Sequence, residues 1–145
     1  MVNEVQAIVD QFGGPSLFGK RLKTEEELRE TIRQGLPRQV LDELIRSCQL
    51  TMKELAASLD LSVRSLQRRR GSDRLTRHES DRLYRLARIV VLAKYYIGEE
   101  DVAFEWLRSR NRALGGKIPL ELLDTEAGAR TVENVLGRIA FGGIS

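Results

Sequence analysis

The sequence has little of the chemistry that enzymes and metal sites need. Its 145 residues include one cysteine, Cys48, and one histidine, His78. A lone cysteine forms neither an internal disulfide nor a cysteine-based zinc site, and one histidine supplies no histidine cluster. No general acid, base and nucleophile can be combined from the remaining residues into a plausible catalytic set. We therefore expect a protein that is not an enzyme, with no cofactor, no metal and no small-molecule substrate.

Long apolar runs and an N-terminal export signal are also missing. No apolar stretch approaches the roughly 20 residues that a membrane-spanning helix requires. Acidic Glu4 and Asp10 precede the first basic residue, Lys20, an order unlike that of a secretory signal. The sequence therefore predicts a cytoplasmic protein that does not contact a membrane. Its length suits one compact domain or two small lobes with a shared core.

Apolar residues recur at helical spacing along the chain, and no strand pattern is present, so we predict an all-α fold. A capping box, in which two side chains satisfy free backbone N–H groups, is expected at three helix starts. The longest predicted helix ends near Gly98, and its residues 86–93 are apolar nearly all round. Such a helix is either central or faces a second subunit. The three capping boxes are Thr24 with Glu27, Thr51 with Glu54, and Thr76 with Glu79.

Two glycines interrupt the last predicted helix. Gly128 and Gly137 each cost about 1 kcal/mol relative to alanine in a helix interior. We predict that both are there to allow close backbone contact.

The net charge is only +3, but it is distributed unevenly. Residues 62–94 contain ten basic and three acidic side chains, and the segments on either side are mildly acidic. One basic segment is typical of a protein in which one face binds a polyanion. A solvated basic helix surface would give the same count, so charge alone leaves both interpretations open.

Residues 51–70, TMKELAASLDLSVRSLQRRR, have the spacing of a helix-turn-helix. A capped helix, the turn Asp60–Ser62 and a second short helix follow in succession, with Val63 and Leu66 expected to point inward. Asp60 stands where such turns usually have glycine, because the backbone there often has a positive φ. The alternative is two short helices of an ordinary bundle.

If the motif binds DNA, its second helix lies in the major groove. Arginine forms two hydrogen bonds with guanine and glutamine with adenine, so the first turns of this helix are candidates for base contacts. The arginines near its end are better placed for phosphate contacts, although they would also complement the helix dipole without a partner. The candidate DNA-binding residues are Arg64, Ser65, Gln67, Arg68, Arg69 and Arg70.

Three stretches resemble antitoxins of the Xre/MbcA/ParS type. They are LSVRSLQRRR at 61–70, ESDRLYRLARIV at 79–90 and AFEWLRSRNRALGGKIPLELLDTEAGARTVENVLGRIAFG at 103–142. The resemblance extends over about residues 35–145, and the last stretch is its most specific part. The residues typical of it are Trp106-Leu107, Asn111, Leu114-Gly115-Gly116, Pro119, Asp124-Thr125, Gly128, Val132 and Gly137-Arg138-Ile139.

This resemblance implies a protein of two functional parts. The helix-turn-helix would bind double-stranded operator DNA and repress the protein's own operon. The C-terminal part would neutralise a cognate toxin, usually a RES-domain enzyme that consumes NAD, by covering the entrance to its active site. The expected division is an N-terminal helical extension at 1–34, the DNA-binding region at 35–75 and the toxin-binding and dimerisation domain at 76–145. The expected toxin contacts are Arg138, Ile139, Phe141, Gly142 and Gly143.

Two alternatives remain open at this point. A stand-alone helix-turn-helix regulator could use its C-terminal part to dimerise or to sense a ligand. The C-terminal residues Ile139 and Phe141 could also belong to the protein's own core, with a frayed end beyond them. In either function we expect a homodimer, because one short recognition helix contacts few bases and two-fold symmetry doubles the contacts. The apolar residues 86–93 suggest an interface there or beside it.

Overall fold

The computed structural model describes residues 4–69 and 74–141. These residues form helices, turns and two isolated β-bridges, and they contain no β-strand. The predicted all-α fold is confirmed. No helix in these residues is long and apolar enough to cross a membrane. The elements are α1 (Glu4–Gln11), η1 (Pro15–Phe18), α2 (Glu25–Gln34), α3 (Gln39–Ser47), α4 (Met52–Ser58), α5 (Val63–Arg69), α6 (Arg77–Ile97), α7 (Glu100–Arg108), η2 (Arg112–Leu114), η3 (Pro119–Leu122) and α8 (Glu126–Ala140), where η is a 3-10 helix.

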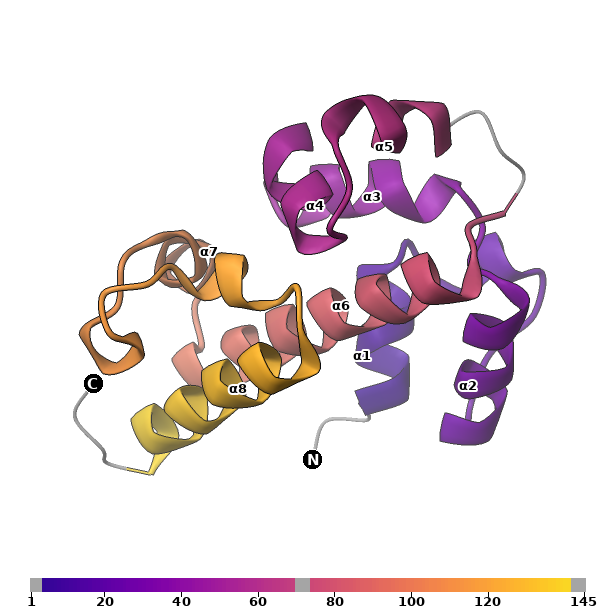
Figure 1. The fold of residues 1–145 in the computed structure, drawn as a ribbon. Coiled ribbons are helices and arrows are strands. Elements are labelled where there is room, and N and C mark those ends of the chain that lie inside the picture. The colour runs from indigo at the N-terminus through magenta and orange to yellow at the C-terminus, as the bar shows by residue number, and fades with distance from the viewer. Residues whose placement is uncertain (1–3, 70–73, 142–145) are drawn as a thin grey trace.

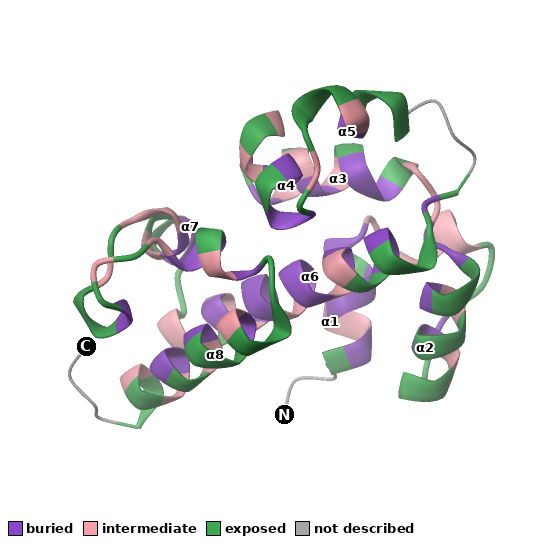
Figure 2. Ribbon diagram, viewed as in Figure 1, coloured by how far each residue is buried: buried purple, intermediate pink, exposed green. Residues whose placement is uncertain are grey.

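The long helix α6 is the centre of the molecule. It contacts α1, α2, α4, α7 and α8, and α3–α5 form a layer above it in the view of Figure 1. Residues 86–93 are buried apart from Arg88 and Leu92, which are partly buried (Figure 2). The protein's own helices therefore cover the apolar stretch, and the expectation of a subunit interface at these residues is wrong.

Local capping fixes where α4 and α6 begin. The Thr51 hydroxyl accepts from Glu54 N at 3.0 Å, and the Glu54 carboxylate accepts from Thr51 N at 2.8 Å. Thr76 and Glu79 form the same pair of bonds at 3.1 and 2.8 Å. Both of these predicted capping boxes are confirmed. The third is incomplete, because the Glu27 carboxylate accepts from Lys23 N at 3.4 Å and not from the backbone of Thr24.

The residues that precede α3 meet those that precede α6 at the N-terminal end of α6. Leu75 N donates to Leu36 O at 2.9 Å, and Leu36 N donates to Ser80 Oγ at 2.8 Å. Gly35 has a φ of +98°, and a Cβ on it would lie 2.2 Å from Leu75 O. Only glycine fits there. The segment before α3 and the segment before α6 therefore pack against each other at the N-terminal end of α6.

The two glycines of α8 differ in their surroundings. A Cβ on Gly128 would lie 1.9 Å from Leu122 O, because the first turn of α8 packs directly on the backbone of η3. A Cβ on Gly137 would meet nothing within 4 Å. The prediction of close backbone contact is therefore confirmed for Gly128 and wrong for Gly137.

Candidate DNA-binding and partner-binding surfaces

Helices α4 and α5 form a helix-turn-helix with a tight connection. Leu61 N donates to Ala56 O at 2.9 Å, and Asp60 has a φ of +54°. Ala56 and Leu66 are 2% and 0% exposed, so the two helices pack closely against each other. The turn therefore has the left-handed residue expected at Asp60, and aspartate tolerates this conformation better than most residues because its short side chain bonds locally.

The outer face of α5 presents most of the predicted base-contacting residues (Figure 2). Arg64, Gln67 and Arg68 are exposed, whereas Ser65 is half-buried and its hydroxyl accepts from Arg68 at 3.3 Å. Val63 was expected to point inward but is 36% exposed at the start of the helix. An exposed valine at this position offers an apolar contact of the kind that recognises the thymine methyl group.

Arg69 differs from the other arginines of α5 because it is held by α6. Its Nε lies 2.6 Å from Glu79 Oε2, and the Glu79 side chain is only 8% exposed. Burial opposes ionisation of Glu79, but hydrogen bonds from Thr76 N and Arg69 outweigh it, so the pKa of this carboxyl lies below its usual value. Arg69 thus links the recognition helix to the first turn of α6. Arg70 lies outside the described residues.

Much of the basic segment at 62–94 is used inside the protein. Arg82 donates to Leu59 O at 2.6 Å, which joins α6 to the turn of the helix-turn-helix. Arg85 and Arg88 donate to the Glu126 carboxylate at 3.1 and 2.9 Å. The charge count of this segment therefore overstates the free cationic surface. The described basic residues of this segment that bond to partners on other elements are Arg69, Arg74, Arg82, Arg85, Arg88 and Lys94.

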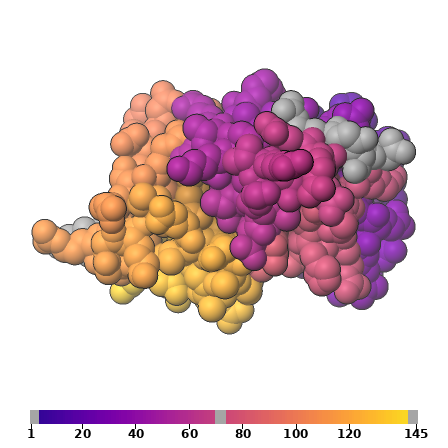
Figure 3. Space-filling view, turned by 45° about the horizontal axis from the view of Figure 1, so that its top comes forward, coloured from indigo at the N-terminus to yellow at the C-terminus, as the bar shows by residue number. Residues whose placement is uncertain are grey.

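An ion pair that the sequence did not suggest connects α7 to α4. Arg108 of α7 donates from Nε and Nη2 to the two carboxylate oxygens of Glu54 at 3.1 and 3.0 Å, and also to Gln49 O. Burial disfavours the charged form of Glu54, but hydrogen bonds from Arg108 and the Thr51 backbone lower its pKa below the usual value. Figure 3 shows the resulting continuous surface, with the α7 region in orange against the purple segment of α4.

The Arg108–Glu54 pair should make a pH-dependent contribution to the free energy of unfolding. Arg108→Met should lower the free energy of unfolding at pH 7 by about 1–2 kcal/mol, because it leaves a partly buried carboxylate without its charged partner. Since the pKa of Glu54 is lowered in the folded state, the pair stabilises above pH 4.5, the ordinary glutamate value, and loses its effect as the pH falls through the lowered pKa. The difference between variant and parent, measured by urea unfolding, should therefore shrink at acid pH.

The matched control is Arg112→Met, a change at an exposed arginine on the neighbouring turn η2. It should leave the free energy of unfolding within about 0.5 kcal/mol of the parent at every pH. A loss from Arg108→Met that is equal at pH 7 and at pH 3 would contradict the role of the ion pair.

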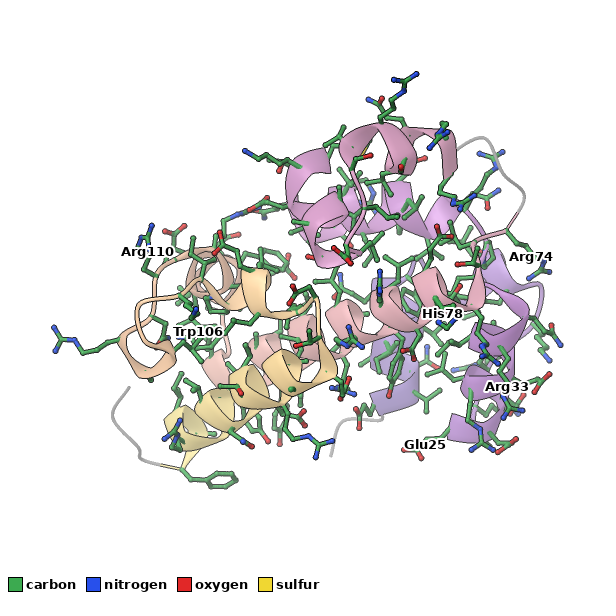
Figure 4. All side chains as sticks on the ribbon, viewed as in Figure 1. Glu25, Arg33, Arg74, His78, Trp106 and Arg110 are labelled. Atoms are coloured by element: carbon green, nitrogen blue, oxygen red, sulfur yellow. The ribbon has the colours of Figure 1, made fainter. Side chains whose placement is uncertain are left out.

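The loop after α7 is built by short-range bonds and exposes positive charge. The Asn111 side chain accepts from Ala113 N at 2.8 Å, and Asn111 N donates to Lys117 O at 3.0 Å. Exposed Arg110 points outward, whereas half-buried Trp106 lies on the side of α7 toward α8 (Figure 4). This loop therefore presents a cationic surface in addition to α5. Its exposed basic residues are Arg110, Arg112 and Lys117.

The end of α8 exposes part of the predicted toxin contact. Arg138 is exposed, Phe141 is 84% exposed, and Ile139 is half-buried against the core. The structure thus brings Arg138 and Phe141 to the surface and gives Ile139 a role in packing. Gly142 and Gly143 lie outside the described residues.

These features define an all-α protein with a helix-turn-helix and a C-terminal helical part. Residues 27–88 match the model of the antitoxin Xre-like helix-turn-helix domain, and residues 87–142 match the antitoxin Xre/MbcA/ParS C-terminal toxin-binding domain. The chain therefore belongs to the Xre/MbcA/ParS-type antitoxins, which are not a known enzyme family. The boundary between the two matches falls inside the continuous helix α6. The division at residues 34 and 75 stays a prediction.

Curated relatives agree with this assignment. The antitoxin Xre of Photorhabdus laumondii is 32% identical over 135 residues, which are 92% of this chain and 87% of that protein. The antitoxin Xre of Yersinia enterocolitica is 32% identical over 117 residues, 79% of each chain. The antitoxin Xre of Pseudomonas putida is 37% identical over 83 residues, 57% of this chain and 52% of that protein.

Proposed function

We propose that this antitoxin neutralises a RES-domain toxin that consumes NAD, and that it represses its own operon, in the cytoplasm. The C-terminal segment at 138–143 would cover the entrance to the toxin's active site. Helix α5 would enter the major groove of the operator, with Arg64, Gln67 and Arg68 at base edges.

The observation that supports both activities is the separation of the two exposed surfaces along α6. Arg69 ties the recognition helix to Glu79 in the first turn of α6, and the Phe141 ring contacts Tyr96 in its last turn. Glu79 and Tyr96 lie 17 positions apart on α6, a distance of about 25 Å at 1.5 Å per residue. One chain therefore has room to hold operator DNA and toxin at the same time.

The DNA-binding unit in this proposal is a symmetric homodimer. Helix α5 has seven residues, of which only the exposed ones reach base edges, so a single copy has too few contacts for a specific operator. The interface must lie outside the buried residues 86–93. Sedimentation at micromolar concentration should show the dimer in the absence of toxin, and a monomer would contradict it.

The function is tested with the reading frame that lies next to this gene. Expression of its product alone should arrest growth and lower cellular NAD, and co-expression of this antitoxin should restore both. The antitoxin should also bind the promoter of the operon in preference to random duplex. Growth arrest without NAD loss would overturn the RES assignment, and equal binding to both duplexes would overturn autorepression.

A further inference from the structure

Three aromatic side chains form a row at the ends of α6 and α8. The ring centroids of Tyr95 and Tyr96 are 5.2 Å apart, and those of Tyr96 and Phe141 are 6.4 Å apart, both with edge-to-face geometry. Tyr95 is 58% exposed and Phe141 is 84% exposed. The two outer rings are thus exposed on either side of a central ring that both contact.

The row is held in place by the fold. Tyr96 is half-buried and packs against the core, and Phe141 caps α8 through a bond from its N–H to Gly137 O at 3.1 Å. Edge-to-face pairs favour this arrangement beyond the area that they bury. The rings are therefore largely ordered before any partner arrives, which lowers the entropic cost of binding.

Isolated apolar side chains are common on protein surfaces, but a cluster of exposed aromatic rings is typical of a binding site. All three residues fall within 87–142, the segment that matches the toxin-binding domain. Arg138 is in the last turn of α8, three residues before Phe141 at the C-cap, and both are exposed. The row is therefore continuous with the surface that we assign to the toxin.

We propose that the row Tyr95–Tyr96–Phe141 is the anchor that docks the toxin on this antitoxin, with α6 supplying contacts in addition to the C-terminal segment. This inference rests on the proposed function. The complementary toxin surface is an apolar hollow with hydrogen-bond acceptors for the tyrosine hydroxyl and a carboxylate for Arg138. Tyr95 and Phe141 contact the toxin, and Tyr96 positions Phe141.

The test measures binding of the purified product of the adjacent reading frame to full-length antitoxin variants by calorimetry. Tyr95→Ser and Phe141→Ser should each weaken binding at least tenfold, as loss of a buried aromatic anchor does at other interfaces. The matched control is Val102→Ser, because Val102 is 48% exposed in the same domain but on α7. This control should change affinity less than twofold. All three variants should stay folded and keep the parent's operator affinity, and the two ring variants should lower the melting temperature only by the few degrees that the loss of one edge-to-face pair costs.

A double-mutant cycle tests the positioning role of Tyr96. Tyr96→Leu keeps an apolar group against the core but removes the ring that contacts Phe141. If Tyr96 acts through Phe141, the combined loss in toxin affinity from Tyr96→Leu and Phe141→Ser should be clearly smaller than the sum of the single losses. Additive losses would overturn this role.

The possible outcomes distinguish a failure of the aromatic anchor from a failure of the proposed function. If the parent antitoxin fails to bind the neighbouring product, the proposed function fails. If the parent binds and Tyr95→Ser binds equally well, the proposed anchor is overturned, and the cationic loop at 108–117 becomes the next surface to test. If the row variants lose dimer formation and keep toxin affinity, the row joins two copies of this chain and the proposal is also overturned.

Discussion

Replacing both Arg64 and Arg68 with alanine should abolish operator recognition and leave toxin neutralisation unchanged. Both side chains project from the exposed face of α5. Each bidentate contact of an arginine with guanine is worth about 1–3 kcal/mol of discrimination, so the double variant should lose at least about thirtyfold in preference for the operator. Fluorescence anisotropy with operator and random duplexes measures this preference, and growth in the presence of the toxin measures neutralisation.

Two comparisons make this result specific. Arg112→Ala removes an exposed arginine from η2, outside the helix-turn-helix, and should leave operator preference unchanged. Arg69→Ala removes the bond to Glu79, so it should lower the melting temperature as well as DNA affinity. If Arg64→Ala with Arg68→Ala weakened binding to operator and random duplex equally, these arginines would contact phosphates and the assignment of base contacts would be wrong.

The largest effect on stability is expected from Gly128→Ala. The added Cβ would lie 1.9 Å from Leu122 O and 2.9 Å from Leu122 C, and a backbone group has little freedom to move away. Overpacking typically costs about 1–3 kcal/mol, and this contact with backbone should cost at least the upper end of that range. Urea unfolding followed by circular dichroism measures the loss, which should be accompanied by weaker toxin binding because η3 and α8 belong to the matched toxin-binding segment.

The same substitution at Gly137 should change the free energy of unfolding in the opposite direction. A Cβ on Gly137 meets nothing within 4 Å, so Gly137→Ala should stabilise the protein by up to about 1 kcal/mol through helix propensity. Both variants place the same methyl group in the same helix, and the difference between them isolates the contact with η3. Equal changes in the free energy of unfolding at the two positions would refute the close approach at Gly128.

The local sequence was sufficient to predict the helix starts and the DNA-binding motif. Capping by Thr51 and Thr76 involves residues three positions apart, so each complete capping box depends only on the chain's immediate neighbourhood. The left-handed conformation of Asp60 follows in the same way from the spacing of a helix-turn-helix. The resemblance of residues 103–142 to a family, which the family match confirms, identified the toxin-binding domain.

The tertiary structure decided which charges and apolar groups are free to act. The sequence alone does not distinguish an arginine that contacts DNA from one that bonds inside the protein. Another element approaches Arg69, Arg82 and Arg108 in the folded chain and makes their bonds internal. The apolar stretch 86–93 was compatible with either a central helix or a subunit interface, and the packing of five helices around α6 covers it. Tyr95 and Phe141 lie 46 positions apart in the sequence, and no local pattern pairs them. Periodicity specifies which side of a helix is buried, but which long side chains meet across helices depends on distances between elements, and these are fixed only when the whole core packs.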